Sequence, residues 1–177
     1  MVNTMELLDV YYAYGNKTGK IIEKGTMLEP GEYFLSVHVY IYNSKGEFLL
    51  QKRSMKLKNH AGMWEMTSGC VTSGEDSLEA ALREVYEELG IYLDADQMKY
   101  MGCFRRKWNL VDIWFAKSDC TPEDYRFNDG EVEEIRLVPA DEMIKEVWNF
   151  VGREETYKQL ITEFIREISV TAGVLTS

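Results

Sequence analysis

Three closely spaced carboxylates are the residues of this chain best suited to chemistry. Glu84, Glu87 and Glu88 lie at positions i, i+3 and i+4 of one segment. If that segment is an α-helix, their side chains share an arc of about 100° on one face. Carboxylates at this spacing repel one another, and clustered carboxylate oxygens suit hard ions such as Mg²⁺ or Mn²⁺. The spacing alone leaves a solvated acidic helix face open as an alternative.

The segment that carries these glutamates has the pattern of an amphipathic helix from Asp76 to Leu89. Asp76 can cap the helix, and Glu79 follows three residues later, as in a capping box. Gly90 is placed to end the helix in the left-handed conformation. An apolar face at 3-4 spacing is formed by Leu78, Ala81, Leu82, Val85 and Leu89. We therefore expect the three glutamates beside this buried stripe.

The rest of the chain alternates strand-like runs with turns and ends in two helical segments. Strands are predicted over 5–14, 20–24, 33–42, 47–53, 101–104, 110–115 and 132–138. Residues 54–66 are predicted to be mostly loop, and helices are predicted from Pro139 to about Phe150 and over Glu154–Val170. Because strands and helices are intermixed, we expect an α/β (α+β) fold in which helices sandwich a mixed sheet.

The composition excludes several classes of protein. The chain has 177 residues, of which 45% are hydrophobic and 28% charged, as in an ordinary soluble domain. The net charge of −10 argues against binding to duplex nucleic acid. No apolar run approaches the roughly 20 residues of a membrane span. Three cysteines without CxxC spacing fit a reducing compartment, so we expect a cytoplasmic protein.

The helix is part of a longer motif that covers residues 69–91. This segment matches G-x5-E-x7-R-E-U-x-E-E-x-G-U, where U is a bulky aliphatic residue, at every fixed position. Such a match should arise by chance in a chain of this length on the order of once in a million. The pattern is the signature of the Nudix hydrolases, and the chain therefore resembles that family.

The resemblance implies a fold, a cofactor and a reaction. The fold is a Nudix-type α/β/α sandwich with a loop–helix–loop catalytic motif, and the cofactor is Mg²⁺ or Mn²⁺. The reaction is the cleavage of a diphosphate linkage in a nucleoside diphosphate-type or other phosphorylated metabolite. Glu84, Glu87 and Glu88 correspond to metal ligands, one of which acts as general base in some members. Gly69 corresponds to a loop glycine whose carbonyl can reach a metal.

The resemblance also assigns roles around the metal ligands. Glu75 and Arg83 correspond to a mainly structural pair that ties the loop to the helix, and Gly90 closes the motif. Family members often recruit a further catalytic carboxylate from outside the motif. Glu131 stands where such a residue usually lies, although a surface loop acid is an equally good interpretation.

Basic side chains would be needed to meet the phosphates of such a substrate. Lys52 and Arg53 end a predicted strand. Arg53 is the preferred phosphate contact, because a guanidinium can make a bidentate pair. The run Arg105-Arg106-Lys107 follows another strand, where solubilising charges are at least as good an explanation.

Segments upstream of the motif, from Leu7 to Ser54, resemble a subgroup related to isopentenyl-diphosphate isomerase. Those isomerases protonate an alkene between a cysteine and a glutamate. Here Ser68 stands at the position of that cysteine, and Cys70 at that of a histidine of the isomerase site. Isomerase activity is therefore the alternative to hydrolysis. A catalytically inactive ligand-binding module is a second alternative, which the intact motif disfavours.

We expect three parts along the chain. Residues 1–32 form an N-terminal β-hairpin extension, 33–150 the Nudix hydrolase domain, and 151–177 a C-terminal helix. The extension and the helix could pack on the core or form a homodimer interface, and the sequence leaves both open. The expected partner is a small-molecule diphosphate substrate, with neither duplex nucleic acid nor a membrane.

Overall fold

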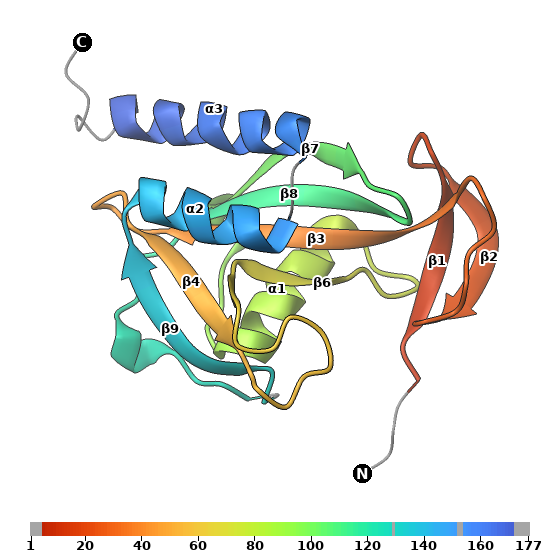
Figure 1. Ribbon diagram of the computed structural model, residues 1–177, viewed down its shortest axis with the longest axis horizontal. Helices are drawn as coiled ribbons and strands as arrows, with labels where there is room; N and C mark the ends of the chain where they lie inside the picture. The colour runs from red at the N-terminus through yellow and green to blue at the C-terminus, as the bar shows by residue number, and fades with distance from the viewer. Residues whose placement is uncertain (1–4, 129, 152–153, 172–177) are drawn as a thin grey trace.

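In the part of the chain that the structure describes, nine strands form a mixed sheet with helices against both of its faces (Figure 1). The computed structural model describes residues 5–128, 130–151 and 154–171, so the ends of the predicted terminal parts lie outside the described residues. The predicted α/β/α arrangement is confirmed. None of the helices in these ranges is long and apolar enough to cross a membrane.

The strands and helices follow one another along the chain with short connections. The strands are β1 Leu7–Tyr12, β2 Lys17–Glu23, β3 Glu32–Tyr42, β4 Phe48–Arg53, β5 Trp64–Glu65, β6 Thr67–Cys70, β7 Met98–Arg105, β8 Asn109–Lys117 and β9 Val132–Val138. The α-helices are α1 Ser77–Leu89, α2 Ala140–Val151 and α3 Glu155–Thr171.

Strand β3 organises the sheet because it pairs with four other strands. It runs antiparallel to β1, β4 and β6. It runs parallel to the whole of β8, from Phe34 opposite Asn109 to Tyr42 opposite Lys117. The parallel pairing with β8 makes the sheet mixed. The hairpin of β1 and β2 continues the same sheet through β1 (Figure 1).

Two local expectations were wrong, whereas residues 54–66 are mostly loop as predicted, apart from the two-residue strand β5. Strand β2 begins at Lys17, three residues before the predicted start at residue 20. Gly69 was expected in a loop but lies in strand β6, opposite Val37 of β3. The sequence Thr-Ser-Gly-Cys has little intrinsic preference for a strand. Its pairing with the long strand β3 supplies the backbone hydrogen bonds that define it.

Successive residues of β3 point to opposite faces and so build two separate cores. Val37 and Val39 pack in one core with Val85 and Leu89 of α1. On the other face, Tyr40 packs in a second core with residues of α2 and α3. Ile161, Phe164 and Ile165 of α3 are buried there. Helix α1 is thereby pressed against the face of the sheet that carries Gly69.

A buried polar cluster ties helix α3 to the sheet. The hydroxyl oxygen of Tyr157 lies 2.6 Å from Nδ1 of His38 and 2.6 Å from the hydroxyl oxygen of Tyr40. All three side chains are buried. Burial lowers the pKa of His38 from 6.5 to about 3, so its imidazole is neutral in the folded protein.

This cluster predicts a loss of stability in mild acid. Unfolded His38 binds a proton near pH 6.5, whereas folded His38 does so only near pH 3, so the folded state loses stability as pH falls below 6.5. At pH 5 the loss amounts to about 2 kcal/mol. Urea unfolding at pH 7 and pH 5 should show this loss in the wild type and not in His38→Gln. An equal loss in both proteins would contradict the assignment.

Candidate active site

Helix α1 is fixed at both ends by the residues that the sequence suggests. The side chain of Asp76 accepts a hydrogen bond from the backbone N–H of Glu79, and Glu79 accepts one from that of Asp76. At the other end Gly90 has φ 70°, and a Cβ there would lie 2.6 Å from the carbonyl oxygen of Arg126. The predicted capping box and the left-handed end are confirmed. These two fixed helix ends determine which residues of α1 face the sheet.

Gly69 leaves space for the carboxylate of Glu84. A Cβ built at position 69 would lie only 2.0 Å from Oε1 of Glu84. The Glu84 side chain is buried, and this burial raises its pKa to about 7 against the opposing charge of Arg83. Glycine is therefore required at this point of β6 for Glu84 to lie where it does.

Arg83 makes hydrogen bonds to four different groups around the start of the motif. Its Nε and Nη2 donate to the carboxylate of Glu75 at 3.1 and 2.6 Å, and Nη2 also donates to the carbonyl of Cys70 at 2.9 Å. Its Nη1 donates to Glu84 and Glu87 at 2.8 and 2.9 Å. The structure thus brings Glu75 and Arg83 together, and the same guanidinium joins two of the predicted metal ligands.

Glu88 is held by a polar pair that the sequence analysis did not find. It is only 2% exposed, and Nε2 of Gln51 donates to its Oε2 at 2.7 Å. Gln51 in turn accepts a hydrogen bond from the hydroxyl of Thr67 at 2.9 Å. The sequence feature that could have indicated this pair is the glutamine that directly follows the apolar residues of β4. A buried amide side chain usually has hydrogen-bond partners.

One cavity of about 690 Å³ brings the predicted catalytic residues together. Glu84, Glu87, Glu88, Glu131 and Gly69 all line it. Sequence reasoning missed further lining residues, which are Met5, Glu6, Lys24, Ser68, Thr72, Tyr86 and Asn128. Three of these belong to the N-terminal segment, which therefore forms part of the cavity wall.

Lys52 and Arg53 are not among the described residues that line this cavity. Nζ of Lys52 lies 3.6 Å from Glu134, and Nη1 of Arg53 donates to the buried carboxylate of Glu65 at 2.6 Å. Their role as phosphate contacts stays a prediction.

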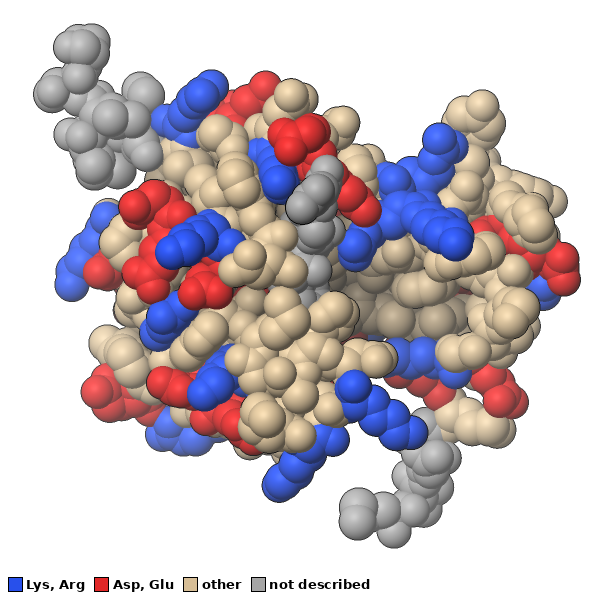
Figure 2. Space-filling model, viewed as in Figure 1, with Lys and Arg blue, Asp and Glu red and all other residues tan. Residues whose placement is uncertain are grey.

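On another part of the surface, a hollow lies beside α2 and α3 and next to the N-terminal hairpin, and Lys and Arg side chains surround it (Figure 2).

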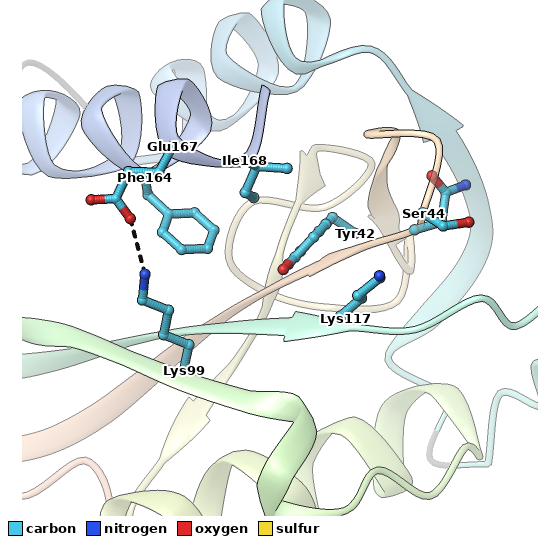
Figure 3. A pocket seen from close by; sticks show the side chains of 8 residues that line it. Tyr42, Ser44, Lys99, Lys117, Phe164, Glu167 and Ile168 are labelled. Carbon is cyan, nitrogen blue, oxygen red and sulfur yellow. Dashed lines mark hydrogen bonds and ion pairs between the residues drawn. The ribbon is translucent and has the colours of Figure 1, made fainter. Parts of the chain in front are cut away.

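A second cavity, of about 250 Å³, lies between α3 and the ends of β3 and β8 (Figure 3). Tyr42 and Phe164 line it with Lys99 and Lys117, and Lys99 makes an ion pair of 2.9 Å with Glu167. None of the candidate site residues named from the sequence is among the described residues that line this second cavity. The glutamates of the motif line the larger one.

The residues around α1 suit a hard divalent cation by donor type. Three carboxylates from one helix face the larger cavity, and carboxylate oxygens are preferred ligands of Mg²⁺. As placed, no group of three Asp, Glu, His or Cys side chains within the described ranges could hold a metal ion. Arg83 donates hydrogen bonds to Glu84 and Glu87, and Gln51 donates one to Glu88. A cation would share these carboxylates with their present partners.

Comparison with known proteins decides the family. The model of the NUDIX domain matches residues 32–160. The chain belongs to the Nudix hydrolase family. An uncharacterized Nudix hydrolase of Listeria monocytogenes is 34% identical over 140 residues, which are 78% of this chain and 83% of that protein. An isopentenyl-diphosphate Delta-isomerase of Pectobacterium atrosepticum is 35% identical over 138 residues, which are 72% of this chain and 74% of the isomerase.

Solved structures show the same fold. A protein from Deinococcus radiodurans has a TM-score of 0.70 at 20% identity, covering 89% of this chain and 98% of its own. A MutT protein from Methanosarcina mazei has a TM-score of 0.57 at 26% identity, covering 80% of this chain and 98% of its own. Nudix hydrolases generally use divalent metal ions, which agrees with the donor set around α1.

The close approach of Gly69 and Glu84 gives a prediction. In Gly69→Ala the Glu84 carboxylate must move, so Mg²⁺ should raise the melting temperature of the wild type but not of the variant. Turnover should fall by about 100-fold or more, as when a major electrostatic group is lost. Cys70→Ala, the neighbour in β6, should stay within about tenfold of wild type. A wild-type response of Gly69→Ala to Mg²⁺ would refute this role of Gly69.

Proposed function

We propose that this Nudix hydrolase cleaves a diphosphate linkage in a nucleoside diphosphate-type or other phosphorylated metabolite, with Mg²⁺ or Mn²⁺. The observation that carries the proposal is that Glu84, Glu87, Glu88 and Glu131 line one cavity. Glu131 comes from the segment before β9, outside the motif. Its backbone carbonyl accepts a hydrogen bond of 2.7 Å from Ser54, which fixes its place in the wall.

The residues of the cavity would have different roles in hydrolysis. When bound, the metal would polarise the phosphorus and lower the pKa of the attacking water. Glu84, Glu87 and Glu88 would hold that metal, and one of the four carboxylates would accept the proton of the water. Arg83 keeps the carboxylates of Glu84 and Glu87 in place through its two short hydrogen bonds.

Isomerisation remains the second candidate because one relative is named an isopentenyl-diphosphate isomerase. The position of the isomerase cysteine is held by Ser68, which lines the cavity here. Cys70 is not among the described lining residues, and burial raises the pKa of its thiol to about 11. A product assay separates the two reactions, because hydrolysis releases a phosphate-containing product and isomerisation only moves a double bond.

The proposal is tested by turnover of a panel of diphosphate compounds with Mg²⁺ or Mn²⁺. The panel should include nucleoside diphosphates and triphosphates, nucleotide sugars and dinucleotide polyphosphates, with detection of released phosphate or nucleotide. Glu87→Gln and Glu88→Gln keep the side-chain shape but remove a charge. For the best substrate, each should lower kcat by a factor on the order of 10²–10⁴.

The matched control for these variants is Glu79→Gln. Glu79 belongs to the same helix but lies in its capping box, and glutamine can also serve there. Its kcat should stay within about twofold of wild type, because surface substitutions have small effects. Wild-type turnover in Glu87→Gln and Glu88→Gln would overturn the proposed function.

We further infer that Lys24 contacts a phosphate of the substrate. Lys24 and Arg83 are the cations among the described residues that line the cavity. Arg83 makes ion pairs with Glu75, Glu84 and Glu87 and donates a hydrogen bond to the carbonyl of Cys70. Lys24 makes an ion pair of 2.6 Å with Glu6. An ammonium group carries three donors, so Lys24 can hold Glu6 and a phosphate oxygen together.

The inference about Lys24 has a matched control in Lys20 of β2, the strand that ends at Glu23, just before Lys24. Lys20 makes a similar ion pair with Glu32, at 2.9 Å, but does not appear in the cavity wall. Lys24→Gln should raise KM by about tenfold with kcat within about threefold, since one charge-assisted hydrogen bond is lost. Lys20→Gln should leave KM within about twofold. Equal KM values for the two variants would contradict the inference.

A further inference from the structure

The first strand of the N-terminal hairpin is hydrogen-bonded to the loop that leads into helix α1. The backbone N–H of Ser73 donates to the carbonyl of Leu7 at 2.7 Å. The Ser73 hydroxyl donates to Oδ1 of Asp9 at 3.0 Å, and the backbone N–H of Gly74 donates to Oδ2 at 3.3 Å. Both oxygens of Asp9 therefore hold the turn between β6 and α1.

The carboxylate of Asp9 stays charged in this position. Its side chain is 13% exposed, and Lys17 lies 2.7 Å away. Burial alone would raise the pKa of Asp9, but the hydrogen bonds from Lys17, Gly74 and Ser73 outweigh it and hold the pKa below its usual value. An ionised carboxylate makes stronger hydrogen bonds than a neutral acceptor.

The hairpin gives Asp9 a fixed place. Leu8 and Val10, on either side of Asp9, are buried in a small core with Ile22 and Leu28. Val10 is also opposite Phe34, so β1 is paired with the central strand. Because side chains alternate along a strand, burial of Leu8 and Val10 turns Asp9 toward the other face, where the loop lies.

The same loop is held from its other side by the motif itself. Oε1 of Glu75 accepts a hydrogen bond from the backbone N–H of Thr72 at 2.6 Å, and Glu75 also bonds Arg83. Arg83 bonds Glu84 and Glu87. A continuous series of contacts thus leads from Asp9 through the turn and Glu75 to the carboxylates of the cavity.

We propose that Asp9 is a positioning residue of the catalytic centre, which fixes the Ser73–Gly74 turn and thereby the alignment of the Glu75–Arg83 pair with Glu84 and Glu87. The inference rests on the proposed hydrolysis. Asp9 is not among the described lining residues of the cavity, so it acts on the rate and not on substrate binding.

The test is a double-mutant cycle with Asp9→Ala and Ser73→Ala, assayed on the best substrate of the wild type. Asp9→Ala should lower kcat by about tenfold or more, with KM within about threefold, because charge-assisted hydrogen bonds are lost. Asp9→Asn, which keeps one acceptor oxygen, should fall between Asp9→Ala and wild type. The double variant should be no worse than about twofold below Asp9→Ala, since both substitutions break the same contact.

Lys17→Gln is the matched control, because it removes the ion pair of Asp9 and leaves the bonds of Asp9 to the loop. Its kcat should stay within about twofold of wild type. Wild-type kcat in Asp9→Ala, effects of Asp9→Ala and Ser73→Ala that multiply in the double variant, or equal losses in Asp9→Ala and Lys17→Gln would each overturn the inference.

A second measurement separates this inference from the proposed function. The dissociation constant of Mn²⁺, measured by calorimetry, should rise by about threefold or more in Asp9→Ala if the turn aligns the carboxylates. If the wild type hydrolyses none of the panel, the proposed function fails and the Mn²⁺ titration decides the role of Asp9. Equal Mn²⁺ affinities of wild type and Asp9→Ala, or no binding by either, would then overturn it.

Discussion

The site depends on how the single positive charge of Arg83 is shared among its neighbours. The guanidinium joins Glu75, Glu84, Glu87 and the carbonyl of Cys70, and so connects a strand, a loop and a helix. Without a cation, carboxylates three and four residues apart on a helix repel one another, and Arg83 offsets part of that repulsion. The same contacts keep the carboxylates at the wall of the cavity, where a divalent cation could bind them.

The rest of the fold places these groups. Strand β3 carries β6 with Gly69 on one side and β8 on the other, and the core beneath it presses α1 against the sheet. The N-terminal hairpin extends this sheet, reaches the loop through Asp9, and adds Lys24 and Glu6 to the cavity. The division of the chain into three parts stays a prediction, as does the homodimer. Within the described residues, however, the hairpin is joined to the active-site loop by direct hydrogen bonds.

The sequence predicted what depends on local patterns and missed what depends on contacts between distant segments. The capping box at Asp76 and the left-handed Gly90 are encoded within a few residues, and both are present. Strand β6 and the support of Glu88 by Gln51 depend on pairing with distant segments, which no local pattern reveals. The motif identified the carboxylates but not the cations around them. Lys24 enters the cavity only because the hairpin folds back onto the sheet, while Arg53 pairs with the buried Glu65.

The central claim is that Glu84, Glu87 and Glu88 form the metal site of a diphosphate hydrolase. Anomalous diffraction from crystals grown with Mn²⁺ and methylenediphosphonate, a diphosphate analogue that cannot be hydrolysed, tests it most directly. We expect a manganese peak in the cavity within bonding distance of at least two of these carboxylates, with the diphosphonate beside it. A cavity that contains the diphosphonate without manganese, or manganese bound only elsewhere on the protein, would contradict the account.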